Sequence, residues 1–328
     1  MKILVIGLGS MGKRRIRLLN QFFENNEIVG VDSREDRCRE CAKIYSIHTS
    51  VSLENALEET QFDCAFICTS PLMHFPIIKK CLESELHVFT EINLTTNGYD
   101  ELIELSRKKG KILFLSSTFI YKKEIQYITD KVENTKGKKN YIYHIGQYLP
   151  DWHPWENFDS YFIGDKRTNG CREILAIELP WITKLFGQVQ EFYVLSEKIT
   201  ELNIDYKDCY HILMQHADGT VGSLIVDVVS RKAVRKLEIF GENLFIEWHG
   251  TPDDLWDYDY MEKTDRNIVN TEKEHVEGYA EFIDEMAYVN EMDTFFKQVN
   301  DGVIPPYTFE DDYYTLELIE EIEKKIYG

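Results

Sequence analysis

The chain has 328 residues, a formal net charge of −20 and 43% hydrophobic residues. This length allows two domains with separate cores, and the acidic balance argues against nucleic acids and anionic membrane surfaces as partners. No apolar run approaches the roughly eighteen residues of a membrane span. The first expected strand leaves no room for a signal peptide, so we expect a cytoplasmic protein.

Metal chemistry is not indicated by the cysteines and histidines. The seven cysteines and nine histidines are scattered along the chain. Cys38 and Cys41 form a CxxC pair, but no second pair or histidine follows at the spacing of zinc ligands. The sequence therefore predicts no metal site.

The N-terminus has the pattern of a dinucleotide-binding turn. A near-continuous apolar run over residues 2–6 precedes three glycines, and a helix is expected from about residue 9 to 23. Gly7 permits a tight turn, Gly9 lets the backbone approach a pyrophosphate, and Gly12 lets the helix pack closely on the strand. The residues expected to bind the cofactor here are Gly7, Gly9, Ser10, Met11 and Gly12.

The identity of the cofactor depends on the end of the second expected strand. Asp32 lies there, about twenty positions after the last glycine, where a carboxylate accepts hydrogen bonds from the adenosine ribose. This carboxylate predicts NAD as the cofactor. NADP stays the alternative, because Arg34 stands beside this position and an arginine there can receive a 2′-phosphate.

Strands and helices continue to alternate up to residue 120. Further strands are expected at 63–69, 86–90 and 112–116, with helices at 74–84 and 97–109 between them. The alternation predicts a doubly wound parallel sheet, whose ligands lie beyond the carboxyl ends of the strands. Further cofactor-binding residues are expected at these ends: Thr69, Ser70, Pro71, His74, Glu91 and Asn93.

After residue 120 the pattern changes to long alternating runs. They cover 141–149, 191–200, 210–230 and 235–248, with a hairpin signal at Asp218-Gly219. They predict a large, mostly antiparallel sheet, and two helices at 277–300 and 309–326 close the chain. The polar stretch 257–274 is expected to be a loop or an edge.

Two domains follow from these patterns. We expect an NAD-binding Rossmann domain over residues 1–120 and an α+β domain over 121–328, with helix 309–326 packing back toward the Rossmann domain. The second domain is expected to bind the substrate. Its sheet offers more apolar surface than the C-terminal helices can cover, so we also expect a homo-oligomer, a dimer or a tetramer.

Several motifs make the chain resemble the Gfo/Idh/MocA family over essentially its whole length. Besides the glycine turn, they are Thr69-Ser-Pro-Leu-Met-His74, His87-Val-Phe-Thr-Glu91, and Phe295-Phe-x-x-Val-x-x-Gly302-x-x-Pro305 followed by Thr308-Phe-Glu-Asp311. The resemblance implies a two-domain NAD(P)-dependent oxidoreductase that acts on a carbinol or keto group of a sugar, cyclitol or nucleotide-sugar. The stretch 146–156 is similar to enzymes of bacterial surface-sugar pathways.

The chain departs from the family at two motifs that carry its chemistry. The usual Glu-Lys-Pro reads Glu91-Ile92-Asn93. The motif GGG-x-x-x-D-x-x-x-H falls on residues 168–178, where Ile174 and Glu178 replace the aspartate and histidine without a gap, or Glu173 and Ile177 with a shift of one. The family's lysine and histidine are therefore missing, and their roles cannot be carried over.

Other residues are candidates for the proton acceptor that carbinol oxidation needs. Glu178 lies on an otherwise apolar helix, where burial favours the neutral carboxyl and suits it to carry a proton near neutral pH; a structural ion pair with Arg172 is the alternative. His153 and Tyr161 lie in an aromatic-rich loop that either holds a sugar ring or forms a small core. Lys122 and Lys123 are also candidates, since either is expected to reach the space that the family's lysine would occupy at Ile92. The alternative is that both lysines are solvated.

Three further residues are expected to contact the substrate. Trp152 offers an aromatic plane for a sugar face. Arg172 is a candidate clamp for a phosphate or carboxylate, and Glu173 lies next to it. A small, sugar-like molecule is thus the expected partner. Rival hypotheses are a lyase, epimerase or glycosidase that retains NAD, and a non-catalytic regulatory protein that binds NAD or a sugar.

Overall fold

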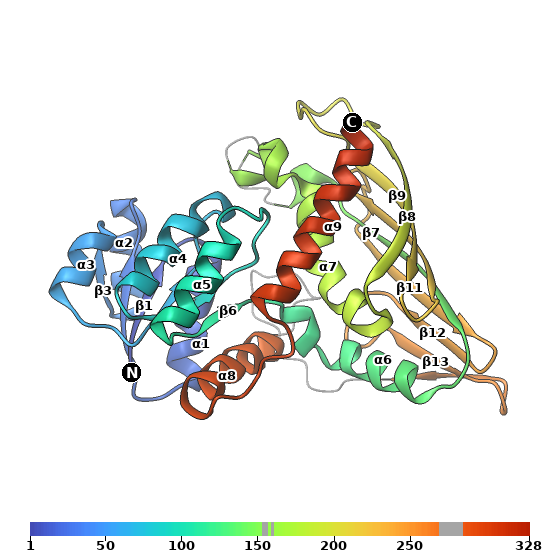
Figure 1. The fold of residues 1–328 in the computed structure, drawn as a ribbon, viewed down its shortest axis with the longest axis horizontal. Coiled ribbons are helices and arrows are strands. Elements are labelled where there is room, and N and C mark those ends of the chain that lie inside the picture. The colour runs from blue at the N-terminus through green and yellow to red at the C-terminus, as the bar shows by residue number, and fades with distance from the viewer. Residues whose placement is uncertain (153–156, 159–160, 269–284) are drawn as a thin grey trace. The chain divides into compact units, whose positions relative to one another are not determined.

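The computed structural model describes residues 1–152, 157–158, 161–268 and 285–328 (Figure 1). The chain divides into two compact units. The first unit comprises Met1–Ser117 and Val289–Tyr314, and the second comprises Thr118–Tyr288 and Thr315–Gly328. The first unit thus ends close to the expected boundary at residue 120, but a segment near the C-terminus also belongs to it.

The first unit is built on a six-stranded sheet in the order β3-β2-β1-β4-β5-β6. All of its strand pairs are parallel, which confirms the doubly wound sheet. The strands β1, β4 and β5 are almost entirely buried, as expected for strands with helices on both faces. The strands are β1 (Lys2–Ile6), β2 (Glu27–Val31), β3 (His48–Ser50), β4 (Cys64–Ile67), β5 (His87–Thr90) and β6 (Leu113–Leu115). The helices between them are α1 (Ser10–Phe22), α2 (Glu35–Tyr45), α3 (Leu53–Glu59), the 3-10 turn η1 (Pro71–Met73), α4 (His74–Glu83) and α5 (Tyr99–Lys109).

The C-terminal helices contribute to the core of the first unit. Phe295 on α8 (Glu285–Asp301) packs edge-on against Phe66, Phe89 and Phe114, with ring centroids 5.4–5.7 Å apart. The last helix, α9 (Phe309–Tyr327), contributes residues 309–314 to the first unit and 315–327 to the second. The Phe295 motif near the end of the sequence therefore fills the core of the N-terminal sheet.

The second unit is built on an eight-stranded sheet in the order β14-β13-β12-β11-β7-β10-β9-β8. Only the β7–β10 pair is parallel, so the expected mostly antiparallel sheet is confirmed. Asp218 and Gly219 make the turn between β9 and β10, with Gly219 at φ +88°. The strands are β7 (Lys139–Gly146), β8 (Val189–Glu197), β9 (Cys209–His216), β10 (Val221–Asp227), β11 (Val234–Gly241), β12 (Leu244–Trp248), β13 (Leu255–Asp259) and β14 (Thr264–Asn267).

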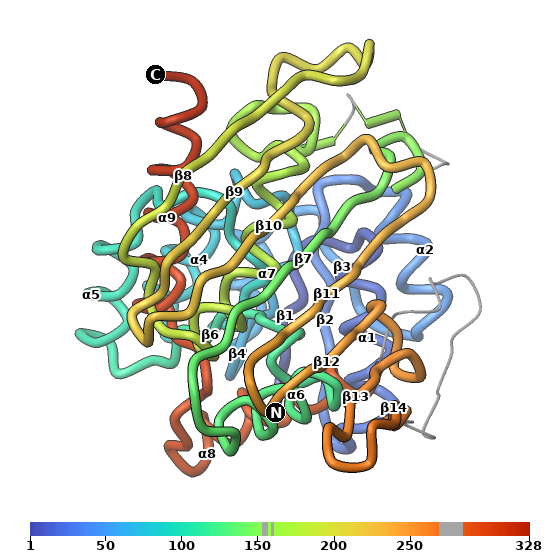
Figure 2. Tube along the Cα trace, turned by 90° about the vertical axis from the view of Figure 1, so that its right-hand side faces the viewer, coloured from blue at the N-terminus to red at the C-terminus, as the bar shows by residue number. Residues whose placement is uncertain are grey.

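One face of this sheet is covered and the other is open. The helices α6 (Lys123–Asn134) and α7 (Gly170–Phe186) lie on the covered face, and most side chains of α7 are buried. Figure 2 shows the open face, with the strands nearest the viewer. Residues 257–268, the described part of the stretch expected as a loop or an edge, contain the end of β13 and the edge strand β14. Within the described residues, no helix is long and apolar enough to cross a membrane.

Candidate functional site

The glycine turn after β1 has the geometry of a phosphate cradle. Gly7 has φ +91°, and a Cβ there would come within 2.7 Å of the Cys68 backbone. A Cβ on Gly12 would lie 1.9 Å from the Gly7 carbonyl oxygen, so both positions require glycine. At Gly9 the nearest atom to an added Cβ is the Arg37 guanidinium, at 3.6 Å. The backbone at Gly9 is thus open to a ligand, and the amino end of α1, with Ser10 and Met11, follows directly.

Asp32 is fixed at the end of β2 by backbone hydrogen bonds. Its Oδ2 accepts a hydrogen bond from the Leu8 amide at 2.8 Å, and its Oδ1 accepts one from the Arg34 amide at 2.9 Å. The carboxylate is 7% exposed. This placement beside the glycine turn fits a carboxylate that receives the ribose hydroxyls of a dinucleotide.

The arginine beside this carboxylate is Arg37, which the sequence reasoning missed. The Arg34 guanidinium, the expected acceptor of a 2′-phosphate, instead pairs with Asp36 at 2.6 Å, and both side chains are exposed. Arg37 Nη1 lies 3.6 Å from Asp32 Oδ2 and is also the nearest group to Gly9. Its position one helical turn after Arg34 in α2 is the signal that could have found it.

Two expected cofactor residues, His74 and Asn93, belong to a buried hydrogen-bond network of the first unit. His74 Nδ1 lies 2.7 Å from Asn93 Oδ1, and His74 Nε2 lies 3.0 Å from the Thr69 carbonyl oxygen. Asn93 Nδ2 donates to the Tyr99 hydroxyl at 2.7 Å, and that hydroxyl donates to Asp312. Burial lowers the pKa of His74 and raises the pKa of Asp312 to about 7. These residues hold the loops after β4 and β5 in place.

The loop after β4 also contains the other expected cofactor residues. Ser70 precedes the buried Pro71, which starts the turn η1. The hydroxyl of Thr69 is buried and makes no hydrogen bond within the described part of the chain. A buried hydroxyl of this kind is satisfied once a ligand or water supplies a partner.

Glu91 is paired with a buried arginine. Arg15 Nε donates to Glu91 Oε1 at 2.7 Å, and Arg15 Nη2 donates to Glu291 Oε2 at 2.8 Å. Ser116 and the Ser117 amide add hydrogen bonds to Glu291. The carboxylates of Glu91 and Glu291 therefore neutralise a fully buried guanidinium, and this pairing gives Glu91 a structural role.

The second unit contains a pocket of about 350 Å³. Its lining includes the apolar side chains of Trp152, of Ile174 and Ile177 from α7, and of Val234 from β11. The ionisable groups in the lining are Glu173, Arg235 and His249. Apolar walls with a few converging polar groups are typical of small-molecule sites. The sequence placed Trp152 and Glu173 at the substrate, and both line this pocket.

Glu173 is the carboxyl that lines this pocket. Its side chain is half-buried, and burial raises the pKa of Glu173 to about 7. Across the described ranges, no hydrogen bond or ion pair involves its carboxylate oxygens. The group therefore keeps its acceptor sites for a ligand or a proton.

Glu178 lies behind the pocket wall and is fully buried. Arg235 Nη2 donates to its Oε1 at 2.7 Å, while Tyr143 Oη and Trp181 Nε1 donate to its Oε2 at 2.8 and 2.9 Å. Although burial opposes its charge, the attraction of Glu178 raises the pKa of Arg235. Glu178 thus holds Arg235 in place, and its two oxygens already accept three hydrogen bonds.

Arg172 has carboxylate partners other than the expected one. It ion-pairs with Glu323, and its Nη2 lies 3.3 Å from Glu320 Oε1. The alternative ion pair between Glu178 and Arg172 is therefore wrong, because Arg235 takes that place. The charge of the Arg172 guanidinium, which was expected to bind a phosphate or carboxylate of the substrate, is neutralised by Glu320 and Glu323.

Lys122 and Tyr161, two further catalytic candidates, are not among the described residues that line the pocket. Lys122 is 4% exposed, and its ammonium lies 4.5 Å from the centre of the Phe119 ring. Tyr161 packs edge-on against Phe162 with ring centroids 5.7 Å apart. His153 lies outside the described residues. Glu178 is likewise not among the described residues that line the pocket.

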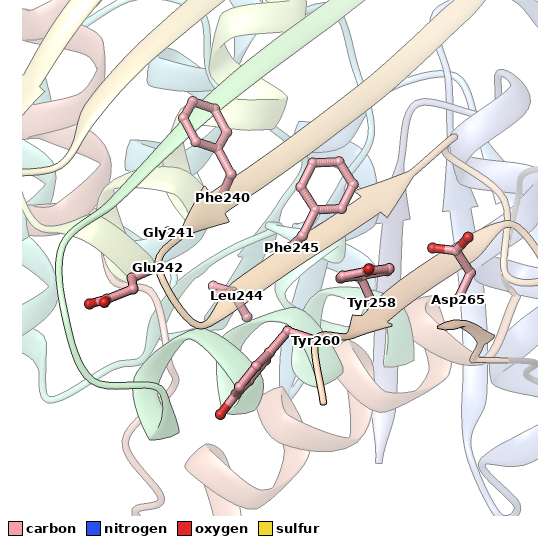
Figure 3. A pocket seen from close by; sticks show the side chains of 8 residues that line it. All are labelled: Phe240, Gly241, Glu242, Leu244, Phe245, Tyr258, Tyr260 and Asp265. Atoms are coloured by element: carbon pink, nitrogen blue, oxygen red, sulfur yellow. The ribbon is translucent and has the colours of Figure 1, made fainter. Parts of the chain in front are cut away.

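A second hollow lies on the open face of the sheet. It has a volume of about 390 Å³. Figure 3 shows Phe240 and Phe245, from the paired strands β11 and β12, with Tyr258 and Tyr260 beside them. This hollow is aromatic and faces away from α7.

The described part of the chain holds no group of three or more His, Cys, Asp or Glu residues that could hold a metal ion.

Comparisons with known proteins agree with this geometry. Residues 1–117 match the Gfo/Idh/MocA model, described as an oxidoreductase family with an NAD-binding Rossmann fold. The myo-inositol 2-dehydrogenase of Thermotoga maritima is 25% identical, over 95% of this chain and 92% of its own length. The structure of biliverdin reductase from Synechocystis sp. PCC 6803, in complex with biliverdin and NADP⁺, is 17% identical with a TM-score of 0.77, covering 98% of each chain.

A third similar protein is the UDP-N-acetylglucosamine 3-dehydrogenase of Acidithiobacillus ferrooxidans. It is 16% identical with a TM-score of 0.76, and the likeness covers 99% of this chain and 97% of that one. These two structural likenesses show the shared fold. The family model matches residues 1–117, including the glycine turn, and one relative aligns with nearly the whole chain, so the chain is similar to the Gfo/Idh/MocA oxidoreductases.

Proposed function

We propose that the protein is an NAD-dependent oxidoreductase acting on a carbinol or keto group of a sugar, cyclitol or nucleotide-sugar. The observation that carries this proposal is the glycine turn, where two positions exclude any side chain, together with the anchored carboxylate of Asp32. Both features fit a dinucleotide. The substrate class is supported by the relatives, since similar proteins are a myo-inositol dehydrogenase and a UDP-N-acetylglucosamine dehydrogenase.

The preference for NAD over NADP rests on charge at Asp32. A fixed carboxylate accepts hydrogen bonds from the ribose hydroxyls and repels a 2′-phosphate. Arg37, 3.6 Å from Asp32, is the residue that opposes this preference. Because one similar structure binds NADP⁺, the preference needs a direct test with both cofactors.

Different residues of this chain would bind the cofactor and the substrate. The backbone at Gly9 and the amino end of α1 would bind the pyrophosphate, and Asp32 would bind the ribose. When bound, the nicotinamide supplies the acceptor for the two electrons and the hydrogen that leave the carbinol carbon. Trp152 and the apolar pocket wall would orient the substrate ring, and Arg235 would donate hydrogen bonds to its oxygens.

The open sheet face supports the proposal of a homo-oligomer. Leu195 and Tyr193 on β8 are 77% and 64% exposed, and Leu213 on β9 is 48% exposed. Large contiguous apolar patches mark interfaces more often than free surface. Register places Tyr193 beside Leu213, and Phe240 beside Phe245 in the aromatic hollow. A second copy of the chain is the occupant we propose for this face.

The proposed function is tested by turnover with a panel of substrates. Purified protein is mixed with NAD or NADP and with myo-inositol, UDP-N-acetylglucosamine or unmodified hexoses, and the formation of reduced cofactor is followed by absorbance. Net reduction with at least one polyol supports an oxidoreductase. Substrate conversion without net reduction would favour an NAD-retaining lyase, epimerase or glycosidase, and NAD binding without any conversion would favour a regulatory protein.

A further inference from the structure

Glu173 differs from every other charged group that lines the pocket of the second unit. Arg235 is paired with Glu178 at 2.7 Å, and His249 is paired with Glu247 at 3.1 Å and with Asp254 at 2.9 Å. Glu173 makes no such contact within the part of the chain that the structure describes. Its carboxyl is nevertheless half-buried on α7, one helical turn from Ile177, which lines the same pocket.

A carboxyl in this position requires a physical explanation. Burial of a charge without a partner is costly, so such a group is either protonated or awaits a ligand. A purely structural carboxyl would resemble Glu178, whose oxygens accept three hydrogen bonds. The same helix therefore carries one carboxyl with fixed partners and one that faces the cavity.

We propose that Glu173 is the catalytic residue that accepts the hydroxyl proton of the substrate, and that Glu178 is a positioning residue that acts through Arg235. This inference rests on the proposed function. It places proton transfer on the residue that lines the cavity, not on Glu178 behind its wall. Arg235, held by Glu178, donates hydrogen bonds to the substrate oxygen or to its neighbour on the ring.

The step is balanced in atoms and electrons. As the alcohol is oxidised, the O–H bond breaks and its proton goes to a carboxylate oxygen of Glu173. The C–H bond would break with both its electrons and its hydrogen going to a bound oxidised nicotinamide, which would supply the hydride acceptor, and the C–O bond would become C=O. The proton on Glu173 then passes to solvent through the open side of the pocket. In the reverse direction the protonated Glu173 returns the proton to the forming alcohol.

The electrostatics of the pocket suit this role near neutral pH. Burial raises the pKa of Glu173 to about 7, and a general base works best when its pKa lies near the working pH. The groups that face it from the other elements are Arg235 from β11, compensated by Glu178, and His249 after β12, compensated by Glu247 and Asp254. Oxidation needs the carboxylate, so its rate falls as pH drops below about 7. Reduction needs the acid, so its rate falls as pH rises above about 7.

Glu173→Gln tests the proposal, with Glu317→Gln on the exposed face of α9 as the matched control. We expect kcat to fall about a hundredfold or more in Glu173→Gln, with KM and the calorimetric Kd for NAD nearly unchanged. Infrared difference spectra recorded between pH 5 and 9 without substrate give a second readout. Two buried carboxyls, Glu173 and Asp312, should contribute to the protonated-carboxyl band that titrates near pH 7 in wild type. The band should lose the Glu173 contribution in Glu173→Gln, leaving that of Asp312, and should keep its full intensity in Glu317→Gln.

Each outcome of the test supports or overturns the proposal. The proposal would be overturned if wild type is active and Glu173→Gln has the same kcat. It would also be overturned if the infrared spectra show that the Glu173 carboxyl ionises near its ordinary pKa. Wild type that converts no substrate of the panel would instead refute the proposed function. His249 is the rival source of an acid limb, because its acidic partners raise its pKa against the opposing effect of burial. If Glu173 accepts the proton, the acid limb of the oxidation rate persists in His249→Asn. Loss of that limb in His249→Asn would assign the proton to His249 and overturn the proposal.

Discussion

The buried ion pair between Glu178 and Arg235 predicts a large stability loss in Glu178→Gln. The substitution keeps the shape of the side chain but removes its charge. Arg235, 17% exposed at its side chain, then lacks its anionic partner. Arg235, Tyr143 and Trp181 all donate hydrogen bonds to Glu178, and the NH₂ group of a glutamine cannot accept one. In either orientation of the amide, the donors on one side therefore lose their acceptor.

The expected size of this loss follows from the burial of the pair. Removing one partner of a buried salt bridge costs about 3–5 kcal/mol, and we expect the lower end because the glutamine oxygen still accepts hydrogen bonds. For a domain of about 150–250 residues, each kcal/mol lowers Tm by about 2–4 °C. The variant should therefore unfold about 6–12 °C below wild type. Adding Arg235→Met should restore much of the loss, because no buried charge is then left unpaired.

Thermal and urea unfolding of wild type, both single variants and the double variant measure this coupling. Glu317→Gln is the control for a charge lost at an exposed site. A Glu178→Gln protein within about 0.5 kcal/mol of wild type would contradict the ion-pair account. If that stable variant also lost turnover about a hundredfold, Glu178 would be the proton acceptor that the sequence suggested.

Three further predictions concern the cofactor, pH and assembly. Asp32→Asn should narrow the difference in calorimetric affinity between NAD and NADP, since the charge that repels a 2′-phosphate is gone; an unchanged ratio would assign the choice to Arg37. Because the pKa of Glu173 rises from 4.5 to about 7 on folding, its ionisation destabilises the native state increasingly above pH 4.5 and fully above pH 7. Glu173→Gln should thus match wild type in urea unfolding near pH 4.5 and exceed it by about 2 kcal/mol at pH 8, after a discount for solvent screening; equal stability at pH 8 would refute this. Light scattering should give wild type a mass of at least twice 38.6 kDa, and Leu195→Asp on the open sheet face should lower it, whereas a wild-type mass of 38.6 kDa would exclude the oligomer.

The parts of the fold that could be predicted have local causes. An apolar strand, a glycine turn and an amphipathic helix follow one another within a few residues, so the doubly wound sheet and the roles of Gly7 and Gly12 were readable from the sequence. The Asp218-Gly219 hairpin was readable for the same reason. The strand β3 is three residues long and polar, so it lacks the apolar run that revealed the equally short β6.

The parts that could not be predicted depend on contacts between distant residues. Arg235 and Glu178 are 57 positions apart, and Arg15 and Glu291 are 276 positions apart. Local pattern indicated that Glu178 is buried, but its partner is set by the register of β11 in the sheet. The choice between Arg34 and Arg37 likewise depends on which face of α2 turns toward Asp32.

The most direct test of the central claim compares NAD binding by wild type and Gly9→Ala. Gly9 has an ordinary φ of −75°, and an added Cβ would meet no atom closer than 3.6 Å, so the variant should fold with an unchanged unfolding midpoint. A methyl group there would nevertheless stand where the pyrophosphate approaches the backbone. By isothermal titration calorimetry we expect NAD to bind wild type and to bind Gly9→Ala at least about tenfold more weakly, a loss of about 1.4 kcal/mol. Equal NAD affinity in the two proteins, or no binding to wild type, would contradict the dinucleotide site.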